Sequence, residues 1–279
     1  MQGRHLRIFG NTMKQSETLS KILAYNVGDI GDACVSESWN QHMKHIQNEF
    51  IKNPPDQFLK FPTVRLTIFC GNSEVTSREY DYLLNYPKWM AGLKDSVFGC
   101  PERFTRDETT TGNSVHQTFH LATYENTTGK NILDFDYIFD FGGGYGCMAK
   151  ILKNLNYKGK YVIFDIEFMS LIQKYYLESI GLKENEDFYM VNDIKDIPSF
   201  NENSLFISTW SLNEVPVKLR EEIKIIVKNF TGILIAYNYT FDNVDNISYF
   251  KEWEKDLLDK SVAYNFSIKL LGHSNYLLM

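Results

Sequence analysis

The sequence predicts an α/β fold: a doubly wound, Rossmann-like and mostly parallel sheet of seven strands, with a helical N-terminal extension. Two observations lead to this prediction. From about residue 130 onward, short apolar strands alternate with helical patterns, and the first strand runs into a glycine-rich loop. Before that point, helical patterns are joined by irregular connections. Alternating strands and helices build βαβ units, which place helices on both faces of a parallel sheet.

The N-terminal part, residues 1–112, is expected to form a separate helical region. Apolar residues at helical spacing predict helices over 15–27, with Ser16 at the start, and over 36–53, ending before Pro54. A third helical pattern over 77–93 is broken before Pro87. The polar, turn-rich segment 98–114 is interpreted as a mobile surface segment or a lid.

Residues 113–279 are expected to form a ligand-binding domain. The strands are expected over 137–141, 160–166, 187–193, 204–210 and 232–241, with helices between them. The second of these helices is expected to stop at Gly181. The tail from residue 267 reads as a hairpin that turns at residues 272–274 and adds an antiparallel strand at one edge. Ligands of such sheets bind at the carboxyl ends of the strands.

The composition excludes several classes of protein. The chain is 43% hydrophobic and 15% aromatic, which predicts a packed core. Its net charge is -6 and it has no Lys/Arg block, so we expect no nucleic-acid partner. The four cysteines form no metal or disulfide pattern. Without a secretion signal or an apolar run of the ~18 residues that a membrane span needs, we expect a soluble, cytoplasmic protein.

The glycine loop is the most informative stretch. Asp140 ends the first strand of the alternation, and Gly142, Gly143, Gly144 and Gly146 follow it. Glycine lets the chain turn sharply and lets a helix N-terminus approach a ligand closely. A dinucleotide loop would need a third small residue at position 147, where the chain has a cysteine. The pattern acid-x-Gly-x-Gly-x-Gly is instead typical of class I S-adenosylmethionine-dependent methyltransferases, which implies S-adenosylmethionine as the cofactor.

The ends of the next strands supply further candidate cofactor contacts. Asp165 ends the second strand, where a carboxylate accepts hydrogen bonds from ribose hydroxyls; a helix N-cap is the alternative role. Asn192 or Asp193, after the third strand, is the candidate for the adenine amine, with a turn role as the alternative. Trp210 and Ser211 follow the fourth strand and are expected beside the site of methyl transfer, although Trp210 suits a core position equally well.

Four segments together resemble a bacterial family of sugar O-methyltransferases. They are SVHQTFHLATY (114–124), FDFGGGYGCMAKIL, GKYVIFDIEFMSLIQKYYLESIGL and FISTWSLNEVPVKLRE. The resemblance covers about residues 110–279 and is looser in the helical first part. It implies a seven-stranded class I methyltransferase fold and methyl transfer to a sugar. The chain departs from the family after the second strand, where it reads Asp165-Ile166-Glu167-Phe168 instead of Asp-x-Pro-Glu.

Methyl transfer to a hydroxyl needs an aligned nucleophile and a group that removes its proton. His116 and His120 are candidate bases, because at i, i+4 they share one face of a helix; packing or capping is their alternative role. Glu214 is the next candidate, with stabilisation of a helix start as its alternative role. His273 is a weaker one. We expect no metal ion, because no cluster of acids or third ligand accompanies the histidines.

The expected function is therefore S-adenosylmethionine-dependent O-methylation of a sugar, nucleotide-linked or from a surface-polysaccharide precursor. The alternative acceptors are an amine, a phosphate-type oxygen or a natural product. A nicotinamide-dependent oxidoreductase is disfavoured by Cys147 and by the lack of a Tyr-x-x-x-Lys pair, and a cofactor-binding scaffold stays possible. The N-terminal helical region is expected to cover the substrate and to mediate a homodimer.

Overall fold

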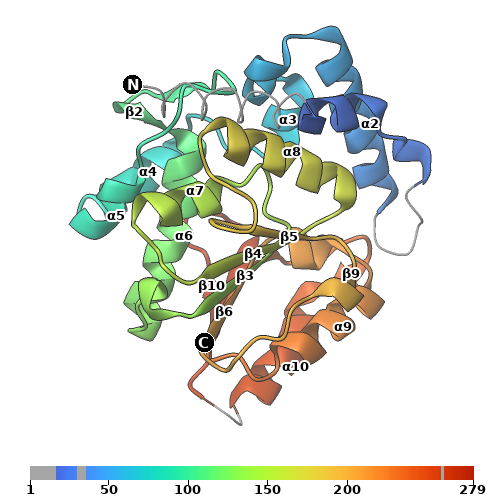
Figure 1. The fold of residues 1–279 in the computed structure, drawn as a ribbon. Coiled ribbons are helices and arrows are strands. Elements are labelled where there is room, and N and C mark those ends of the chain that lie inside the picture. The colour runs from blue at the N-terminus through green and yellow to red at the C-terminus, as the bar shows by residue number, and fades with distance from the viewer. Residues whose placement is uncertain (1–16, 30–35, 259–260) are drawn as a thin grey trace.

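The computed structural model describes residues 17–29, 36–258 and 261–279. Its centre is a seven-stranded sheet with the order β10-β11-β7-β6-β3-β4-β5 (Figure 1). The strands are β3 (Tyr137–Phe141), β4 (Lys160–Phe164), β5 (Tyr189–Val191), β6 (Ser204–Thr209), β7 (Gly232–Asn238), β10 (Tyr264–Ser267) and β11 (Ser274–Leu278). Strands β5, β4, β3, β6 and β7 are parallel, whereas β11 runs antiparallel to β7 and β10. The predicted doubly wound, mostly parallel sheet of seven strands is confirmed.

Helices cover both faces of the sheet. Successive side chains of a strand point to opposite faces, so Ile138 packs in one core and Phe139 in the other. The core of Ile138 includes residues of α6 (Gly112–Thr128), α7 (Cys147–Asn154) and α8 (Glu167–Ser179). The core of Phe139 includes residues of α9 (Val217–Val227) and α10 (Asn246–Leu258). Two helical layers around one sheet give a three-layer architecture.

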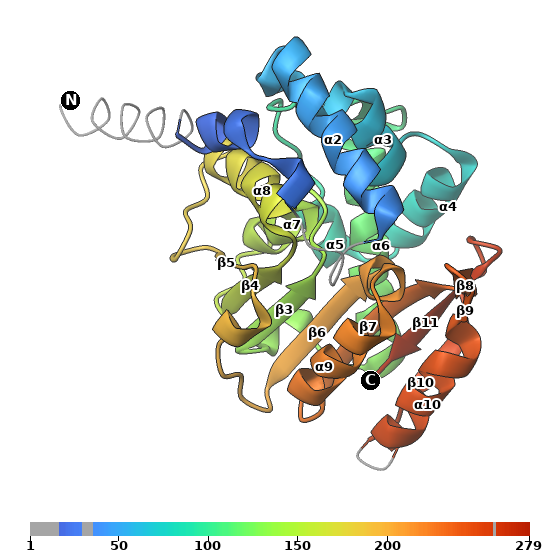
Figure 2. The ribbon, with the colours of Figure 1, turned by 90° about the vertical axis from the view of Figure 1, so that its right-hand side faces the viewer.

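The N-terminal helices pack onto the layer of α6, α7 and α8 and share its core, to which Met43, Phe50 and Phe58 contribute. Figure 2 shows α2, α3 and α4 gathered at one end of the sheet. The elements of this region are a helical stretch over 17–24, α2 (Glu37–Lys52), α3 (Pro62–Thr67), α4 (Glu74–Leu83) and α5 (Pro87–Gly92), with short 3-10 helices at Val27–Asp29 and Pro55–Lys60. The expected helix start at Ser16 lies outside the described residues, as does Cys34.

The expected break before Pro87 is confirmed: the pattern over 77–93 falls in two helices, α4 and α5, because Pro87 cannot continue the first. Two expectations are corrected by the structure. The segment 98–114 is not an irregular lid: it contains the hairpin β1 (Arg103–Phe104) and β2 (Asp107–Thr111), in which Thr110 and Thr111 are buried. The expected C-terminal hairpin is present and antiparallel, but its edge strand, β10, precedes residue 268, and Ser274 begins β11 instead of lying in the turn.

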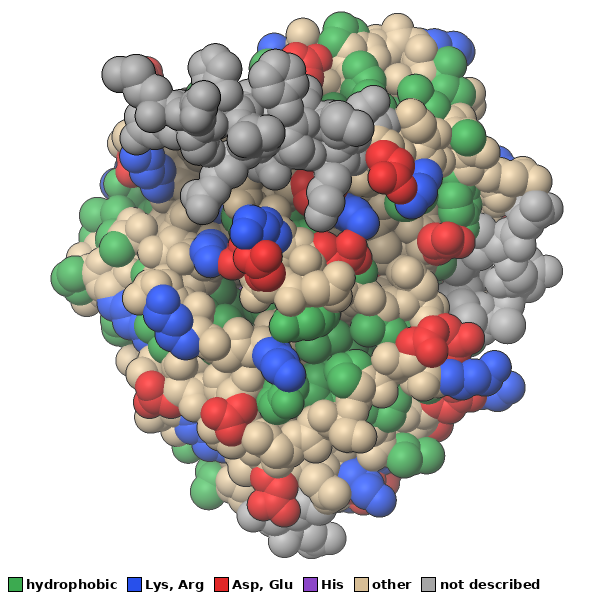
Figure 3. Space-filling model, in the orientation of Figure 1, with side chains coloured by type: hydrophobic (Ala, Val, Ile, Leu, Met, Phe, Trp, Pro, Cys, Tyr) green, Lys and Arg blue, Asp and Glu red, His purple; other side chains and the backbone are tan. Residues whose placement is uncertain are grey.

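The remaining elements are short. They are the 3-10 helices Ile132–Asp134, Ile194–Asp196 and Ser211–Glu214 and the hairpin of β8 (Thr240–Phe241) and β9 (Val244–Asp245). Within the described part of the chain, no helix combines the length and the apolar character that crossing a bilayer requires. The face drawn in Figure 3 carries scattered acidic and basic side chains around a central group of hydrophobic ones.

Candidate functional site

A cavity of about 460 Å³ lies at the carboxyl ends of β3, β4 and β6, beneath α2. The register aligns these strand ends, because Asp140 pairs with Ile163 of β4 and Ile207 of β6. Most of the site residues expected from the sequence line this cavity: His116, Asp140, Gly142, Gly143, Gly144, Asp165, Asn192, Trp210, Ser211 and Glu214. The structure thus brings together candidates that are far apart in the chain.

The glycine loop between β3 and α7 is packed too closely for a side chain at Gly142. The backbone N–H of Gly142 donates a 2.8 Å hydrogen bond to the carbonyl of Phe164, and its φ is +75°. A Cβ at this position would lie 2.2 Å from the Cβ of Ser211. Ser211 is held there by its hydroxyl, which donates to the carbonyl of Phe141. The loop therefore presents backbone rather than side chains to the cavity.

Asp140 is a buried carboxylate beneath this loop. The hydroxyl of Tyr161 donates a 2.6 Å hydrogen bond to its Oδ2. Burial raises the pKa of Asp140 to about 6, and the Tyr161 bond opposes this rise. A Cβ at Gly143 would lie 3.1 Å from Asp140 Oδ2, so the carboxylate supports the loop directly from below.

Asp165 stands at the end of β4, beside the loop. Its Oδ1 accepts a 2.8 Å hydrogen bond from the backbone N–H of Ile166, and its Oδ2 accepts one of 2.6 Å from Gln173. Desolvation, with a smaller contribution from Asp140, raises the pKa of Asp165 to about 7, and the hydrogen bonds from Ile166 and Gln173 oppose this rise. Both carboxylate oxygens of Asp165 are thus held in fixed positions at the cavity wall.

The two candidates after β5 have different surroundings. Asn192 lines the cavity, and its side-chain amide donates to the backbone carbonyl of Asp165 at 2.8 Å and to the hydroxyl of Ser170 at 2.5 Å. Asp193 lies outside the cavity lining. Its carboxylate accepts a 3.0 Å hydrogen bond from the backbone N–H of Lys195 and caps the short 3-10 helix there. Of the two candidates, Asn192 lines the cavity and Asp193 does not.

Trp210 and His116 form one wall of the cavity. Trp210 has a φ of +68°, which is unusual for a residue with a side chain, and its backbone N–H bonds to the carbonyl of Ala236 at 2.7 Å. This conformation lays the indole against the imidazole of His116, with ring centroids 5.3 Å apart and planes at 14°. Trp210 therefore lines the cavity and is not only a core residue.

Behind that wall, His116 belongs to a buried chain of side chains. Its Nδ1 bonds to Oε1 of Glu79 at 2.8 Å, and its Nε2 lies 3.2 Å from Nε2 of His120. The Nδ1 of His120 bonds to the hydroxyl of Tyr276. His120 is fully buried and outside the cavity lining, and desolvation together with His116 holds its pKa well below the usual value. Both ring nitrogens of His116 are therefore already engaged.

Glu214 faces the cavity from the opposite side. Its Oε2 accepts a 2.8 Å hydrogen bond from the indole N–H of Trp39 in α2. Desolvation raises the pKa of Glu214, and Asp242 adds to this rise. No described residue forms a hydrogen bond with its Oε1, so one carboxylate oxygen is free to contact a ligand.

The carboxyl groups among the described cavity-lining residues have no basic Lys or Arg counterpart there. Asp140, Asp165 and Glu214 supply three carboxyl groups, and the described lining residues include neither Lys nor Arg. Such a wall favours a ligand with positive charge and disfavours a diphosphate, which is usually met by Lys, Arg or a free helix N-terminus. No cluster of three or more His, Cys, Asp or Glu side chains with metal-binding geometry occurs in the described ranges.

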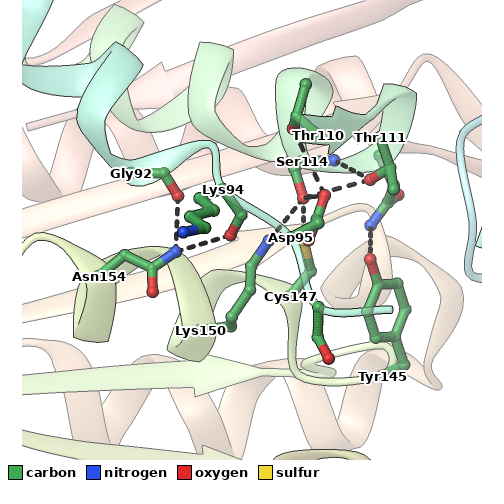
Figure 4. Close-up of polar contacts among 12 residues, drawn as sticks. Gly92, Lys94, Asp95, Thr110, Thr111, Ser114, Tyr145, Cys147, Lys150 and Asn154 are labelled. Atoms are coloured by element: carbon green, nitrogen blue, oxygen red, sulfur yellow. Dashed lines mark hydrogen bonds and ion pairs between the residues drawn. The ribbon is translucent and has the colours of Figure 1, made fainter. Parts of the chain in front are cut away.

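A buried polar cluster anchors the helix that follows the glycine loop (Figure 4). Lys150 of α7 pairs with Asp95 and donates a 2.7 Å hydrogen bond to the hydroxyl of Ser114, which in turn donates to Asp95 at 2.6 Å. All three side chains are almost inaccessible to solvent. Next to them, Asn113 donates to the hydroxyl of Tyr145 at 3.1 Å. The cluster ties the N-terminal region to α6 and α7.

Sequence reasoning missed several residues of the site. Glu79, Gln173 and Tyr276 contact the expected residues only through the fold. Gln173 lies in one of the segments that carry the family resemblance, but the sequence assigned it no role. Gln117 lines the cavity without a hydrogen-bond partner among the described residues. The one available signal was its position next to His116 on the same helix.

No protein-family model matches this sequence, and no curated protein matches it significantly. Several solved structures are similar. Magnesium protoporphyrin IX methyltransferase (ChlM) from Synechocystis PCC 6803, with bound S-adenosylhomocysteine, is 11% identical over 74% of this chain and 98% of its own, with a TM-score of 0.41. A SAM-dependent methyltransferase from Aquifex aeolicus is 20% identical over 57% of this chain and 90% of its own, with a TM-score of 0.37.

A chain of the Pnkp1/Rnl/Hen1 RNA repair complex is 16% identical over 57% of this chain, with a TM-score of 0.43. The match spans 41% of that chain, less than half of its length. All three TM-scores lie below 0.5, so these similarities assign no function to this chain. They do not confirm the sugar O-methyltransferase family, and, since one comes from an RNA repair complex, they lend no support to the exclusion of nucleic acid as a partner.

Proposed function

We propose that this chain is an S-adenosylmethionine-dependent O-methyltransferase that methylates a hydroxyl group of a sugar. One observation carries the proposal: a single cavity combines a glycine loop that has no room for a side chain at Gly142 with carboxyl groups from adjacent strand ends, and its described lining has neither Lys nor Arg. This combination suits a ligand that has a ribose, a compact amino-acid portion and a positive charge, and it does not suit a dinucleotide.

The residues present fit S-adenosylmethionine. Asp165 would accept hydrogen bonds from the ribose hydroxyls, because both of its oxygens are fixed at the cavity wall. The backbone of Gly142 and Gly144 would pass beneath the amino-acid portion. Asn192 would contact the adenine, since its amide lies at the same end of the cavity as Asp165. The carboxyl groups would favour the positive charge of the sulfonium and of the ammonium group.

When bound, S-adenosylmethionine would supply a methyl group on a positively charged sulfur, which the acceptor oxygen displaces to leave S-adenosylhomocysteine. The acceptor must lose a proton, and Glu214 is the favoured base because its Oε1 is free and burial raises its pKa. Trp39 holds the other oxygen and so fixes the orientation of the carboxylate. His116 would have to break a hydrogen bond before it accepted a proton, and His120 lies behind it, so both histidines support the wall formed by Trp210.

The acceptor end of the cavity suits a sugar. Trp39, His116 and Trp210 offer ring faces to the apolar side of a pyranose, and Gln117 and Glu214 offer polar atoms for its hydroxyls. The N-terminal region would cover the acceptor, since Trp39 and Cys70 come from it; a homodimer through this region stays a prediction.

An amine is the second candidate acceptor. The same aromatic rings and the same carboxylates also favour a cationic ligand. A protonated amine would have to lose its proton to Glu214 before it attacked the methyl group, so both candidates use the same base.

A transfer assay tests this proposal. The protein is incubated with S-adenosylmethionine that is tritium-labelled in its methyl group, together with neutral glycosides, nucleotide-linked sugars or amines. Label on the glycosides or sugars supports the proposed acceptor class, whereas label on the amines alone supports the second candidate. The Asp165→Ala variant is the control, because loss of the ribose contact should abolish transfer to either class.

A further inference from the structure

Gln173 joins the two strand-end loops that form the cofactor end of the cavity. It lies in α8, and its side chain is fully buried. Its Nε2 donates a hydrogen bond of 2.6 Å to Oδ2 of Asp165 and one of 3.1 Å to the carbonyl of Gly144. Asp165 follows β4 and Gly144 follows β3, so one amide group bridges two neighbouring strands.

The orientation of this amide is fixed by its partners. Both partner atoms are acceptors, so only the NH₂ end of the Gln173 side chain can face them. The other end, Oε1, is buried and has no hydrogen-bond partner among the described residues. An unsatisfied buried carbonyl is unfavourable, so the side chain is not optimised for stability alone. An apolar residue of the same size would avoid this cost but would leave Asp165 Oδ2 unsupported.

The bridge controls which atoms Asp165 offers to a ligand. The backbone N–H of Ile166 holds Oδ1, and Gln173 holds Oδ2. With both oxygens fixed, the carboxylate cannot rotate, and its remaining lone pairs keep one direction. A ribose presents two adjacent hydroxyls at a fixed spacing, so a carboxylate with a fixed orientation binds them with less loss of freedom than a rotating one.

We propose that Gln173 is a positioning residue for the cofactor, which holds the Asp165 carboxylate and the Gly144 loop in the arrangement that binds the ribose of S-adenosylmethionine. This inference rests on the proposed function and goes beyond it, because it assigns a role to a residue that does not line the cavity. Gln173 acts through Asp165 and does not itself touch the ligand.

The bridge also sets the pH at which the site binds. The hydrogen bond from Gln173 lowers the pKa of Asp165, whereas burial and Asp140 at the end of β3 raise it to about 7. The other acids nearby are Glu167 at the start of α8 and Asp193 after β5, and no Lys or Arg of the described lining compensates them. Without Gln173 the pKa of Asp165 should therefore rise further, so that the carboxylate becomes protonated at a higher pH as the pH is lowered.

Calorimetric titration with S-adenosylhomocysteine between about pH 6 and pH 8.5 tests the proposal, since this range spans the pKa of Asp165. Gln173→Met keeps the length of the side chain and removes the donor. Gln47→Met is the matched control: Gln47 also donates two hydrogen bonds through its Nε2, to the backbone carbonyls of Ile22 and Tyr25, but lies outside the cavity. Thermal melts of each variant monitor the fold.

For Gln173→Met we expect binding about 10-fold weaker or more at neutral pH, the usual effect of losing a hydrogen bond to a charged group. The pH at which affinity declines should also move upward, because the carboxylate of Asp165 becomes easier to protonate. Gln47→Met should bind like the wild type at every pH. An unchanged affinity, or a loss of the same size at every pH, would overturn the proposal.

Gln173→Glu gives a second signature, which also serves if the methionine variant folds poorly. It places a second carboxyl group beside Asp165. At the lower pH values the pair can hold one proton and keep a hydrogen bond, whereas at the higher values both groups are charged and repel each other, so the deficit relative to the wild type should grow as the pH rises, opposite to the trend of Gln173→Met. A deficit that shrinks with rising pH would contradict the proposed contact. If the wild type itself fails to bind S-adenosylhomocysteine, the proposed function fails. If the wild type binds it and Gln173→Met binds it equally well, only the role of Gln173 fails.

Discussion

The indole N–H of Trp39 donates a 2.8 Å hydrogen bond to the Glu214 carboxylate, although the two residues are separated by 175 positions in the chain. Trp39 belongs to α2 in the N-terminal region, and Glu214 belongs to the short helix that follows β6. The contact closes one side of the cavity and holds one carboxylate oxygen. It therefore links the covering helices to the proposed base.

Glu214→Gln should abolish most methyl transfer while leaving cofactor binding intact. Removing a general base lowers turnover by about 10²–10⁴-fold. The amide keeps the shape of the side chain, and its carbonyl can still accept the bond from Trp39. Turnover is measured with labelled S-adenosylmethionine, and binding by titration with S-adenosylhomocysteine. A variant with wild-type turnover would show that Glu214 is not the base.

The pH profile of turnover provides an independent check on Glu214. Desolvation raises the pKa of this group, and a base works only when deprotonated. Activity should therefore rise with pH through a pKa above the ordinary glutamate value. Glu214→Gln should lack this rising limb, and its persistence in the variant would point to another titrating group.

Gly142→Ala should eliminate binding of S-adenosylhomocysteine. The new Cβ would lie 2.2 Å from that of Ser211, and the backbone φ of +75° is strained for alanine. Gly129→Ala is the matched control, because Gly129 has a φ of +72° and no atom within 4 Å of the added Cβ. Each variant carries about 1–2 kcal/mol of backbone strain. A loss of affinity in Gly142→Ala that is absent in Gly129→Ala therefore reports the clash with Ser211 and not the strain. Equal affinities would contradict the described packing of the loop.

Asp140→Asn should stabilise the fold above about pH 6, and the gain should disappear near pH 4. The pKa of Asp140 is about 6 in the folded protein and 3.8 in its ordinary state. The folded state thus binds more protons between these values, so wild-type stability falls as the pH rises through them. A shift of this size corresponds to about 3 kcal/mol at most. Denaturant titrations at both pH values measure it, and a variant less stable than the wild type at pH 8 would contradict the account.

Lys150→Met should destabilise the protein strongly, because it leaves the buried carboxylate of Asp95 without its cation. Breaking a buried pair by removing one partner costs about 3–5 kcal/mol. The double variant Lys150→Met with Asp95→Asn should recover part of this loss, since the orphaned charge is removed too. Unfolding free energies of both variants test this, and a double variant that is less stable than the single one would refute the pairing.

Local patterns were sufficient to predict most of the sheet. The strand over 137–141 has the predicted bounds, and Asp140 and the glycines that follow it lie in adjoining positions of the chain. Burial on both faces gave the strands continuous apolar runs, which are easy to recognise. The edge was harder to predict, because β10 is mostly exposed and lacks that signal, so the hairpin was expected to start at residue 267, where β10 in fact ends.

Long-range contacts could not be predicted in this way. Glu79 approaches His116 only because α4 packs against α6, and Gln173 reaches Gly144 only because α8 packs against the glycine loop that follows β3. The segment 98–114 is rich in polar residues, yet Thr110 and Thr111 of β2, which packs against α6, are buried. Composition reports the average exposure of a segment, whereas these roles depend on which distant element covers it.

Titration of the wild-type protein with S-adenosylhomocysteine, with NADH in parallel, tests the central claim most directly. The account predicts micromolar binding of S-adenosylhomocysteine, no binding of NADH, and loss of the first in Asp165→Ala. Binding of NADH alone, or binding of S-adenosylhomocysteine that survives in Asp165→Ala, would contradict it.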